Sequence, residues 1–181
     1  MIEFSKEHMP SLSRGAFDDP RLEVVITDGA EWVKQAELAG TFDVAIIDST
    51  DPVGPGAVLF TREFYTAVAA LLNPSRGVVV TQNGMVFLDP DELSGTLASF
   101  RDLFADWGCY TATVPTYTGG PMAFGWGSHA PPSSRPSAED LEARFAAANL
   151  DTFYYAPDVH LAAFVLPVYV KKIVAAVKSG E

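Results

Sequence analysis

The chain has 181 residues, which is enough for one domain with a sizeable core and argues against two. Hydrophobic residues make up 48% of the sequence and charged residues 19%, which excludes a disordered or fibrous chain. Acidic residues outnumber basic ones by 23 to 12, and the net charge of −11 argues against binding to nucleic acid or an anionic membrane, since such contacts need Lys and Arg.

Strand-like and helix-like patterns alternate in the first part of the chain, which is typical of an α/β domain with a parallel sheet. The patterns predict a strand at 22–27, a helix at 31–39 that ends at Gly40, and a second strand at 42–47. Residues 44–47 are all apolar, which predicts a strand covered by helices on both faces.

The middle of the chain predicts a helix capped by Thr61, a valine-rich strand at 77–82 and a further helix. This further helix begins at Asp89 and Pro90, with the Asp89 carboxylate as its cap and proline in its first turn.

The last part of the chain predicts a closing pair of strands at 110–114 and 122–127, joined by a turn-rich loop. A Pro/Ser-rich connector then leads to a helix capped by Ser137 and to an amphipathic tail. We therefore expect a core at 1–130 and a C-terminal helical extension of the same domain at 131–181.

The most informative stretch follows the second predicted strand. Asp48 and Asp51 lie just beyond the carboxyl end of that strand, where open α/β sheets bind their ligands. A Pro/Gly-rich loop at 52–56 follows, stiff enough for a lid and with glycines to hinge it. Aspartates of this kind also shape turns, and the spacing alone does not separate the two interpretations.

Polar residues follow the neighbouring strands as well. Asp28, with Gly29, either contacts a polar edge of a ligand or caps the next helix. The run 82–84 (Gln-Asn-Gly) points polar groups toward the same rim or forms a tight turn. Tyr117, in a Gly/Pro-rich loop, supplies a hydroxyl or an aromatic wall, or lies in a surface turn. Three successive strand ends with polar residues together predict one ligand-binding rim.

Cysteine and histidine usage argues against several classes of site. One cysteine, Cys109, and three widely separated histidines exclude a disulfide framework, a multi-cysteine zinc site and an HExxH-type metal motif. The first eight residues lack an apolar core of signal-peptide length, and Pro167 and Lys171-Lys172 interrupt the apolar tail. We expect a soluble cytoplasmic protein with no membrane segment.

A family resemblance rests on motifs that occur in one order at suitable spacings. The motifs are Phe17-Asp18-Asp19-Pro20-Arg21, Asp28-Gly29, Asp48-Ser49-Thr50-Asp51-Pro52-Val53-Gly54-Pro55, Gln82-Asn83-Gly84, Pro115-Thr116-Tyr117-Thr118-Gly119-Gly120, Tyr154-Tyr155, Asp158-Val159-His160 and Ala162-Ala163-Phe164-Val165-Leu166-Pro167. Together they resemble the spermidine synthases (polyamine aminopropyltransferases), particularly the bacterial type. The resemblance implies a Rossmann-like sheet of the S-adenosylmethionine-dependent methyltransferase type, with flanking helices.

The resemblance also implies an activity in polyamine biosynthesis. Family members transfer an aminopropyl group from decarboxylated S-adenosylmethionine to putrescine, giving spermidine and methylthioadenosine, without a metal or a tightly held cofactor. In this chain Asp48 would be the general base. The implied substrate-binding residues are Asp28 and Gly29 for the adenine end, Asp48, Ser49, Thr50 and Asp51 for the diamine, Pro55 for methylthioadenosine, and Gln82 and Tyr117, the latter positioning the attacking amine.

The chain departs from the family in its amino-terminal portion. Family members carry a small β-rich domain and then two strands with a glycine-rich loop, and residues 1–13 supply no such loop. We therefore expect a partial sheet without its first two strands and without the N-terminal β-domain. Three explanations stay open: a fragment or misassigned start, a missing half supplied by a separate polypeptide, and a rearranged relative.

The missing amino-terminal portion affects which partners and which alternative functions we expect for the chain. We expect a homodimer, or pairing with a polypeptide that supplies the missing half, and no nucleic-acid or membrane partner. The alternative is a non-catalytic polyamine- or nucleoside-binding protein or dimerisation partner derived from the family. A methyltransferase-like enzyme is a third interpretation, and the two-aspartate loop argues against it because methyl transfer needs no site for a dication.

Overall fold

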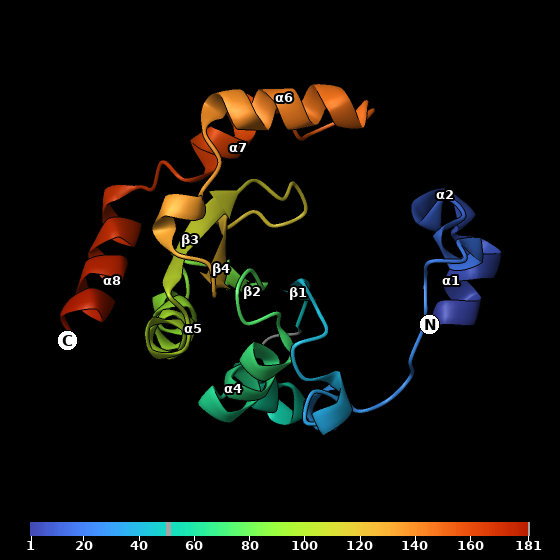
Figure 1. Ribbon diagram of the computed structural model, residues 1–181, viewed down its shortest axis with the longest axis horizontal. Helices are drawn as coiled ribbons and strands as arrows, with labels where there is room; N and C mark the ends of the chain where they lie inside the picture. Colours follow the sequence, from blue (N-terminus) through green and yellow to red (C-terminus); the bar gives the residue numbers. More distant parts are fainter. Residues whose placement is uncertain (50–51, 181) are drawn as a thin grey trace.

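The computed structural model describes residues 1–49 and 52–180 (Figure 1). Its helices and strands, in chain order, are α1 (Ile2–His8), α2 (Pro10–Ser13), α3 (Gly29–Trp32), β1 (Val44–Ile47), α4 (Arg62–Leu71), β2 (Val78–Met85), α5 (Pro90–Leu103), β3 (Asp106–Ala112), β4 (Met122–Ser128), α6 (Ala138–Ala148), α7 (Pro157–Ala163) and α8 (Val168–Ser179). Short 3₁₀ turns lie at Ala16–Asp18, Ala36–Leu38, Gly54–Phe60 and Pro132–Ser134.

One four-stranded sheet, in the order β1-β2-β4-β3, forms the centre of the molecule. β1 and β2 pair in parallel, whereas β4 is antiparallel to both of its neighbours. The predicted closing pair of strands is therefore confirmed, and the sheet is mixed rather than wholly parallel. The β2–β4 register shifts between Gln82 and Met85, so the carboxyl end of β2 carries a bulge.

Helices α4 and α5 cover one face of the sheet, and α6 and α7 lie on the opposite side (Figure 1). On the first face Val79 packs in a cluster with Val68 from α4 and Phe100 from α5. A second cluster joins α5 to α8 through Leu97 and Val170. These two clusters bury one face of the sheet, which holds the strand ends in fixed positions.

Local capping chemistry sets several of the helix starts. The Thr61 hydroxyl accepts a hydrogen bond from the Phe64 amide at 3.2 Å, and Ser137 and Asp140 form a capping box, so both predicted caps are confirmed. Asp89 does occupy the N-cap position of α5, but its side chain makes no capping hydrogen bond. The helix begins there because Pro90, in its first turn, already has the backbone angle that a helix requires.

Three expectations about the first part of the chain are wrong. Residues 22–26 form neither helix nor strand, because no strand in the described part of the chain pairs with them. The helix expected at 31–39 ends early, since Gln35 takes an extended conformation with ψ 120°. β1 is covered on one face only, and Val44 and Ile46 are exposed on the other.

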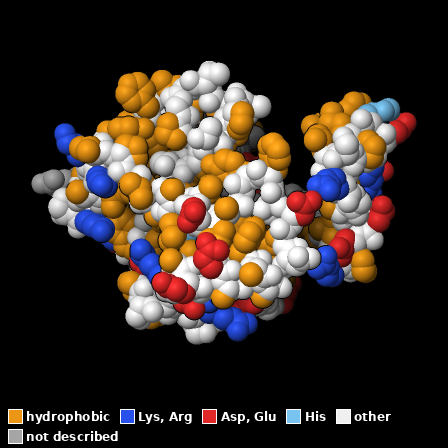
Figure 2. All heavy atoms as spheres, turned by 90° about the horizontal axis from the view of Figure 1, so that it is seen from above, with side chains coloured by type: hydrophobic (Ala, Val, Ile, Leu, Met, Phe, Trp, Pro, Cys, Tyr) orange, Lys and Arg blue, Asp and Glu red, His pale blue; other side chains and the backbone are white. Residues whose placement is uncertain are grey.

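Residues 1–21, which we call the arm, contain α1 and α2 and stand apart from the rest of the molecule (Figures 1 and 2). An extended segment joins the arm to α3. At the other end of the chain, α7 and α8 meet at an angle of 61°. No single helix among the described residues is long and apolar enough to cross a membrane, and only this bent pair passes by length and composition.

Candidate functional site

The carboxyl ends of three strands meet at one edge of the sheet, which we call the site edge. β1 and β2 run in parallel, and β3 runs in the same direction because each of β2 and β3 is antiparallel to β4. The segments that follow β1 and β2, and the loop between β3 and β4, therefore all begin at this edge. Open sheets of this type bind ligands there.

Asp48 and Ser49 come directly after β1, and their side chains have opposite surroundings. Asp48 is exposed at the site edge, whereas Ser49 is only 8% exposed. The Ser49 hydroxyl has no hydrogen-bond partner among the described residues. The backbone carbonyl of Ser49 accepts a long hydrogen bond, 3.5 Å, from the side-chain Nε2 of Gln82 at the end of β2. The structure thus brings two of the predicted site segments together.

Asn83 does not face the site edge, contrary to the sequence prediction. Its side chain is fully buried under the sheet, where it accepts from the Gly125 amide at 2.9 Å and donates to the Thr96 hydroxyl at 2.8 Å. The Tyr65 hydroxyl lies 3.2 Å from the same Thr96 oxygen. Asn83 lies on the same face of β2 as the buried Val79 and Thr81, so the regular alternation of side chains along the strand turns it into the core and leaves Gln82 on the other face.

Asp28, which follows the segment predicted as the first strand, has a clear structural role. The Asp28 carboxylate accepts from the amides of Ala30 at 2.8 Å and Glu31 at 3.3 Å, so it caps α3, which begins at Gly29. The capping interpretation of Asp28 is therefore confirmed. A ligand contact of Asp28 and Gly29 stays a prediction.

The loop after β1 is only partly described. Thr50 and Asp51 lie outside the described residues, and the diamine contacts expected of them stay predictions. Pro55 is exposed in the 3₁₀ turn Gly54–Phe60, which follows this loop and leads into α4. Gly54 has φ +61°, a backbone angle that glycine takes without strain.

Tyr117 lies in the β3–β4 loop at the site edge, and it is exposed. Its amide donates to the Val114 carbonyl at 3.0 Å, which closes the turn. Further along the loop, the Gly119 amide donates to the Met85 sulfur at 3.2 Å, so the loop rests on the end of β2. A Cβ at Gly119 would require the ends of the Met85 and Leu88 side chains to move.

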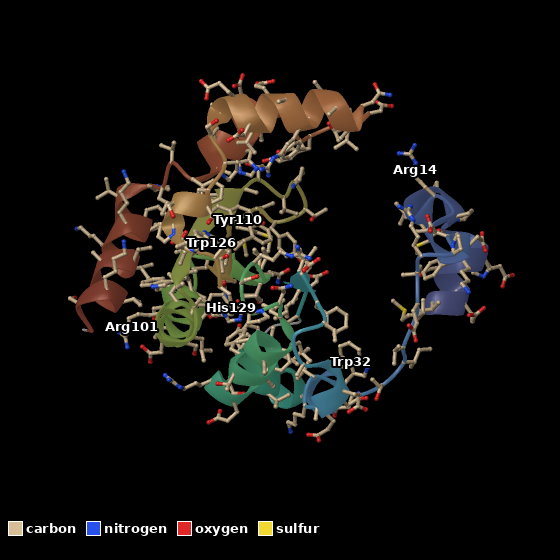
Figure 3. The ribbon with its side chains drawn as sticks, viewed as in Figure 1. Arg14, Trp32, Arg101, Tyr110, Trp126 and His129 are labelled. Carbon is tan, nitrogen blue, oxygen red and sulfur yellow. The ribbon has the colours of Figure 1, made fainter. Side chains whose placement is uncertain are left out.

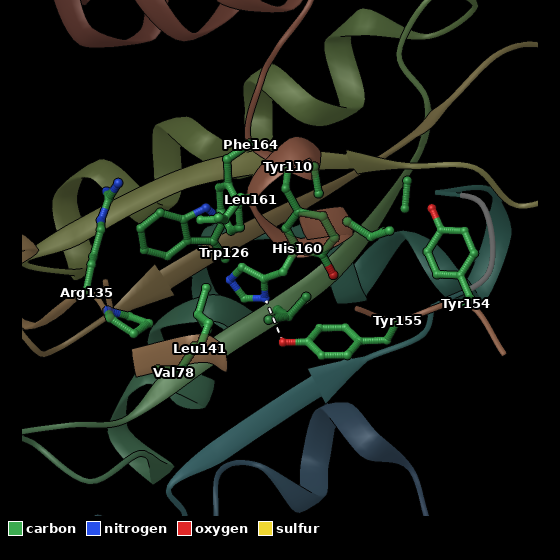
Figure 4. A pocket seen from close by; sticks show the side chains of 15 residues that line it. Val78, Tyr110, Trp126, Arg135, Leu141, Tyr154, Tyr155, His160, Leu161 and Phe164 are labelled. Carbon is green, nitrogen blue, oxygen red and sulfur yellow. Dashed lines mark hydrogen bonds between the residues drawn. The ribbon is translucent and has the colours of Figure 1, made fainter. Parts of the chain in front are cut away.

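A separate groove of about 600 Å³ lies between the sheet and α7, and the predicted site residues do not line it (Figures 3 and 4). Tyr110 and Trp126 project from the sheet into it, and Phe164 closes it from beyond the end of α7. His160 and Tyr155 lie 3.4 Å apart through Nδ1 and the hydroxyl. The sequence shows that Val78, Val80 and Trp126 are apolar, but only the packing of α7 shows that they line a groove.

Polar groups in this groove are few. The Arg135 guanidinium lies 4.8 Å from the Trp126 ring centroid and makes two hydrogen bonds of 2.7 Å to Asp106, which raise the pKa of the arginine. The indole nitrogen of Trp126 is buried without a hydrogen-bond partner among the described residues. No three His, Cys, Asp or Glu side chains gather as metal ligands in 1–49 or 52–180.

Comparison with known sequences gives one consistent match. A profile described as the spermine/spermidine synthase domain matches residues 1–136. The chain is 56% identical over 173 residues to a polyamine aminopropyltransferase of Ruegeria sp. (strain TM1040), covering 96% of this chain and 60% of the relative. It is 49% identical over 170 residues to polyamine aminopropyltransferase 1 of Pseudomonas aeruginosa, covering 94% and 58%.

Comparison with solved structures agrees with the sequence matches. A crystal structure of spermidine synthase in complex with the transition state analogue AdoDATO matches with a TM-score of 0.84 and 34% identity, over 96% of this chain and 57% of the other. Spermidine synthase from Thermotoga maritima matches with a TM-score of 0.82 and 33% identity, over 96% and 56%. The chain therefore spans about three fifths of the length of the relatives it matches.

Proposed function

The chain belongs to the spermine/spermidine synthase family, and from this we propose that it contributes the acceptor-amine side of an aminopropyltransferase site. The proposed reaction transfers an aminopropyl group from decarboxylated S-adenosylmethionine to putrescine and yields spermidine and methylthioadenosine. The observation that carries the proposal is the Asp48-Ser49 segment at the end of β1, held beside Gln82 at the end of β2. The two substrates supply all the reacting atoms.

The first chemical obstacle is the protonation of the acceptor amine. An alkyl amine with a pKa like that of lysine, about 10.4, is neutral in only about one molecule in 2,500 at pH 7, a cost of roughly 4.6 kcal/mol. A carboxylate beside the attacking nitrogen binds the cation and then accepts its proton, which typically accelerates a reaction about 10²–10⁴-fold. Asp48 is the proposed base, because it stands exposed at the rim where a substrate can reach it.

The second requirement is alignment. The neutral amine attacks the carbon next to the sulfonium, the new carbon–nitrogen bond forms as the carbon–sulfur bond breaks, and the electron pair moves to sulfur. Since a thioether is a good leaving group, orientation dominates the barrier, and good alignment supplies roughly 7–11 kcal/mol. In this proposal Gln82 and Tyr117 hold the amine in line, and the buried Ser49 fixes the backbone that carries Asp48.

The remaining substrate contacts are also proposals. Asp28 and Gly29 would face the adenine end of the nucleoside, Pro55 its methylthio portion, and Thr50 and Asp51 the distal amine. These roles come from the family resemblance, and the exposure of Asp28 and Pro55 leaves both accessible to a ligand. A cytoplasmic location stays a prediction, as does the division into a core at 1–130 and an extension at 131–181.

The relatives are longer than the part of them that this chain matches, so we propose that turnover requires an additional polypeptide segment. Large apolar side chains lie exposed in several parts of the chain, among them Phe87 and Leu88 in the turn after β2 and Val168 at the start of α8. This exposure supports association, either with a second copy in a homodimer or with a polypeptide that supplies the rest of the site.

The decisive experiment measures methylthioadenosine formation from decarboxylated S-adenosylmethionine and putrescine. The chain is assayed alone and together with the unmatched two fifths of the Ruegeria relative, produced as a second polypeptide. We expect turnover in the mixture, and we expect Asp48→Asn to lower kcat about 10²–10⁴-fold while the far-ultraviolet circular dichroism stays unchanged. Asp151→Asn, at another exposed carboxylate, is the matched control and retains the rate.

Two results would contradict the proposal. Full turnover by the Asp48→Asn variant would remove the base assignment. Calorimetric binding of putrescine or methylthioadenosine by the mixture, with no product, would instead favour a non-catalytic binding protein.

A further inference from the structure

The β3–β4 loop, residues 113–121, is tied to other parts of the chain at two points. Among the described residues, two hydrogen bonds join it to segments outside the β3–β4 pair, and in both a loop amide donates to a side chain. The Thr113 amide donates to the Tyr154 hydroxyl at 3.4 Å, and the Gly119 amide donates to the Met85 sulfur at 3.2 Å. Because a thioether sulfur is a weak acceptor, the Tyr154 hydroxyl is the stronger type of acceptor of the two.

The bond at Thr113 affects Tyr117 because the backbone between these residues is stiff. The pairing with β4 ends at Ala112, so Thr113 is the first residue that the sheet no longer holds. Pro115 has a fixed φ, and it restricts Val114 before it to extended conformations. The Tyr117 amide then donates to the Val114 carbonyl at 3.0 Å, which closes the turn. An anchor at Thr113 therefore sets the direction in which Tyr117 leaves the sheet.

Tyr154 lies in a turn that is fixed to both α6 and α7. The Thr152 hydroxyl donates to the Tyr155 carbonyl at 2.7 Å, which closes this turn. The Tyr155 ring lies 5.8 Å from the ring of Phe145 in α6, and its hydroxyl lies 3.4 Å from Nδ1 of His160 in α7. Figure 4 shows the Tyr155 hydroxyl directed at His160 and the Tyr154 hydroxyl directed away from it.

The end of α7 is in turn fixed to the strand that leads into the loop. The ring of Phe164, just beyond α7, lies 5.6 Å from Tyr110 in β3 and 6.3 Å from Trp126 in β4. Tyr110 also stacks on Phe124 of β4 at 5.1 Å. The turn that carries Tyr154 is therefore held in place relative to the strand end that its hydroxyl contacts.

The exposure of Tyr154 indicates that its hydroxyl matters more than its ring. The side chain is 57% exposed, so burial of the ring contributes little to stability. A phenylalanine would keep the same ring contacts in the groove, and the bond to Thr113 is what distinguishes the two residue types at this position.

We propose that Tyr154 is a positioning residue for the acceptor-amine site, because its hydroxyl fixes the start of the β3–β4 loop and thereby the direction of Tyr117. This inference rests on the proposed function, in which Tyr117 holds the attacking amine in line. Without the Tyr154 hydroxyl the Thr113 amide bonds to water, and the loop samples more orientations. The amine is then aligned less often, and alignment is a large part of what such a site contributes.

Hydrogen–deuterium exchange of the full chain, followed by mass spectrometry, measures the loop directly and needs no turnover. Tyr154→Phe keeps the ring and removes the hydroxyl, so we expect amides in 113–121 to exchange about 3- to 10-fold faster, as for the loss of one hydrogen bond. Tyr169→Phe, on α8, is the matched control, because the Tyr169 hydroxyl bonds no described residue and its removal leaves the loop unchanged. The far-ultraviolet circular dichroism stays the same in both variants.

Steady-state kinetics in the turnover assay described above test the consequence for the amine. In Tyr154→Phe we expect the KM for putrescine to rise about 3- to 10-fold and the KM for decarboxylated S-adenosylmethionine to stay unchanged, because Tyr117 faces the amine in the proposed function. A merely structural role would lower the amount of active protein, and with it kcat, and would leave both KM values unchanged. Tyr169→Phe keeps all three constants.

The outcomes keep this inference separate from the proposed function. The inference is overturned if the loop exchanges alike in Tyr154→Phe and the wild type, if Tyr169→Phe accelerates exchange equally, or if turnover falls while both KM values stay unchanged. Faster loop exchange in Tyr154→Phe, with no turnover by the wild type, supports the anchoring by Tyr154 and counts against the proposed function. Turnover by the wild type, with normal loop exchange in Tyr154→Phe, does the reverse.

Discussion

Ser49 combines a buried position with a polar hydroxyl that makes no hydrogen bond to the described residues. Its hydroxyl is buried beside an exposed aspartate and has no partner among the described residues, and an unsatisfied buried hydroxyl costs about 1–3 kcal/mol. The cost is consistent with a residue whose position is fixed by the needs of a site rather than by stability alone. The neighbouring Gln82 contact shows that two strand ends cooperate in forming this part of the rim.

The buried network of Asn83, Thr96 and Tyr65 leads to a prediction about stability. Thr96→Val leaves the Asn83 amide and the Tyr65 hydroxyl without their shared partner, so we expect the free energy of unfolding to fall by about 1–3 kcal/mol. Thr96→Ser keeps the hydroxyl and removes one methyl group, which costs roughly 0.8 kcal/mol. Urea unfolding curves measure both, and equal losses in the two variants would show that the hydroxyl is unimportant.

Cys109 gives a prediction about pH. Burial raises the pKa of its thiol to about 11, whereas an unfolded cysteine titrates near 8.5. Above the unfolded pKa the unfolded chain loses this proton first, so the stability contribution is complete below that pKa and is lost as the pH rises toward the folded value. Between about pH 8 and pH 10 we expect the wild type to lose roughly 1–2 kcal/mol more than Cys109→Ala.

Chemical denaturation of both proteins at several pH values makes this measurement. Burial also raises the pKa of Tyr65 and Tyr110, and these residues affect both proteins alike, so the difference isolates the thiol. A difference that stays constant with pH would mean that Cys109 is accessible to solvent.

At the scale of elements, the start of α4 depends on one hydroxyl. Thr61→Ala removes the acceptor for the Phe64 amide, and the loss should be about 1 kcal/mol because α4 packs in the main core. Thr61→Ser retains the cap and serves as the control. The midpoint of thermal unfolding reports the change, and an unchanged midpoint in Thr61→Ala would show that the rest of the helix start is sufficient.

For the strand β1, the sequence predicts that a strand forms but does not predict which of its faces is covered. Its apolar run predicts a strand, and the strand is present, but Val44 and Ile46 are exposed, with no described helix covering their face. The segment at 22–26 also depends on its neighbours. The sequence predicts a strand there, but the segment stays outside the sheet because no described strand pairs with it. Strand formation depends on neighbours, whereas the caps of α4 and α6 depend on residues three positions apart.

At the scale of the whole molecule, the arm should contribute little to stability. Figures 1 and 2 show it apart from the rest, and α1 and α2 contain no buried residue. We expect trypsin to cut first after Arg14 and Arg21, and deletion of residues 1–21 to change the free energy of unfolding by less than about 0.5 kcal/mol. Mass spectrometry of the first fragments and thermal unfolding of the shortened chain provide the check. A large loss of stability would show that the arm packs on the body in solution.

The sequence by itself determined the order of the motifs, the family and most of the helix and strand positions, because caps, periodicity and motif spacing are local properties. It also placed Asp48, Gln82 and Tyr117 at one edge of the sheet, since parallel strands share that edge. Only the tertiary structure decided that Asn83 enters the core and that Ser49 is buried, because the helices that pack on the sheet determine which strand face is covered. The bare face of β1 and the groove before α7 were likewise decided by packing, because exposure depends on which elements lie opposite rather than on the residues of the strand.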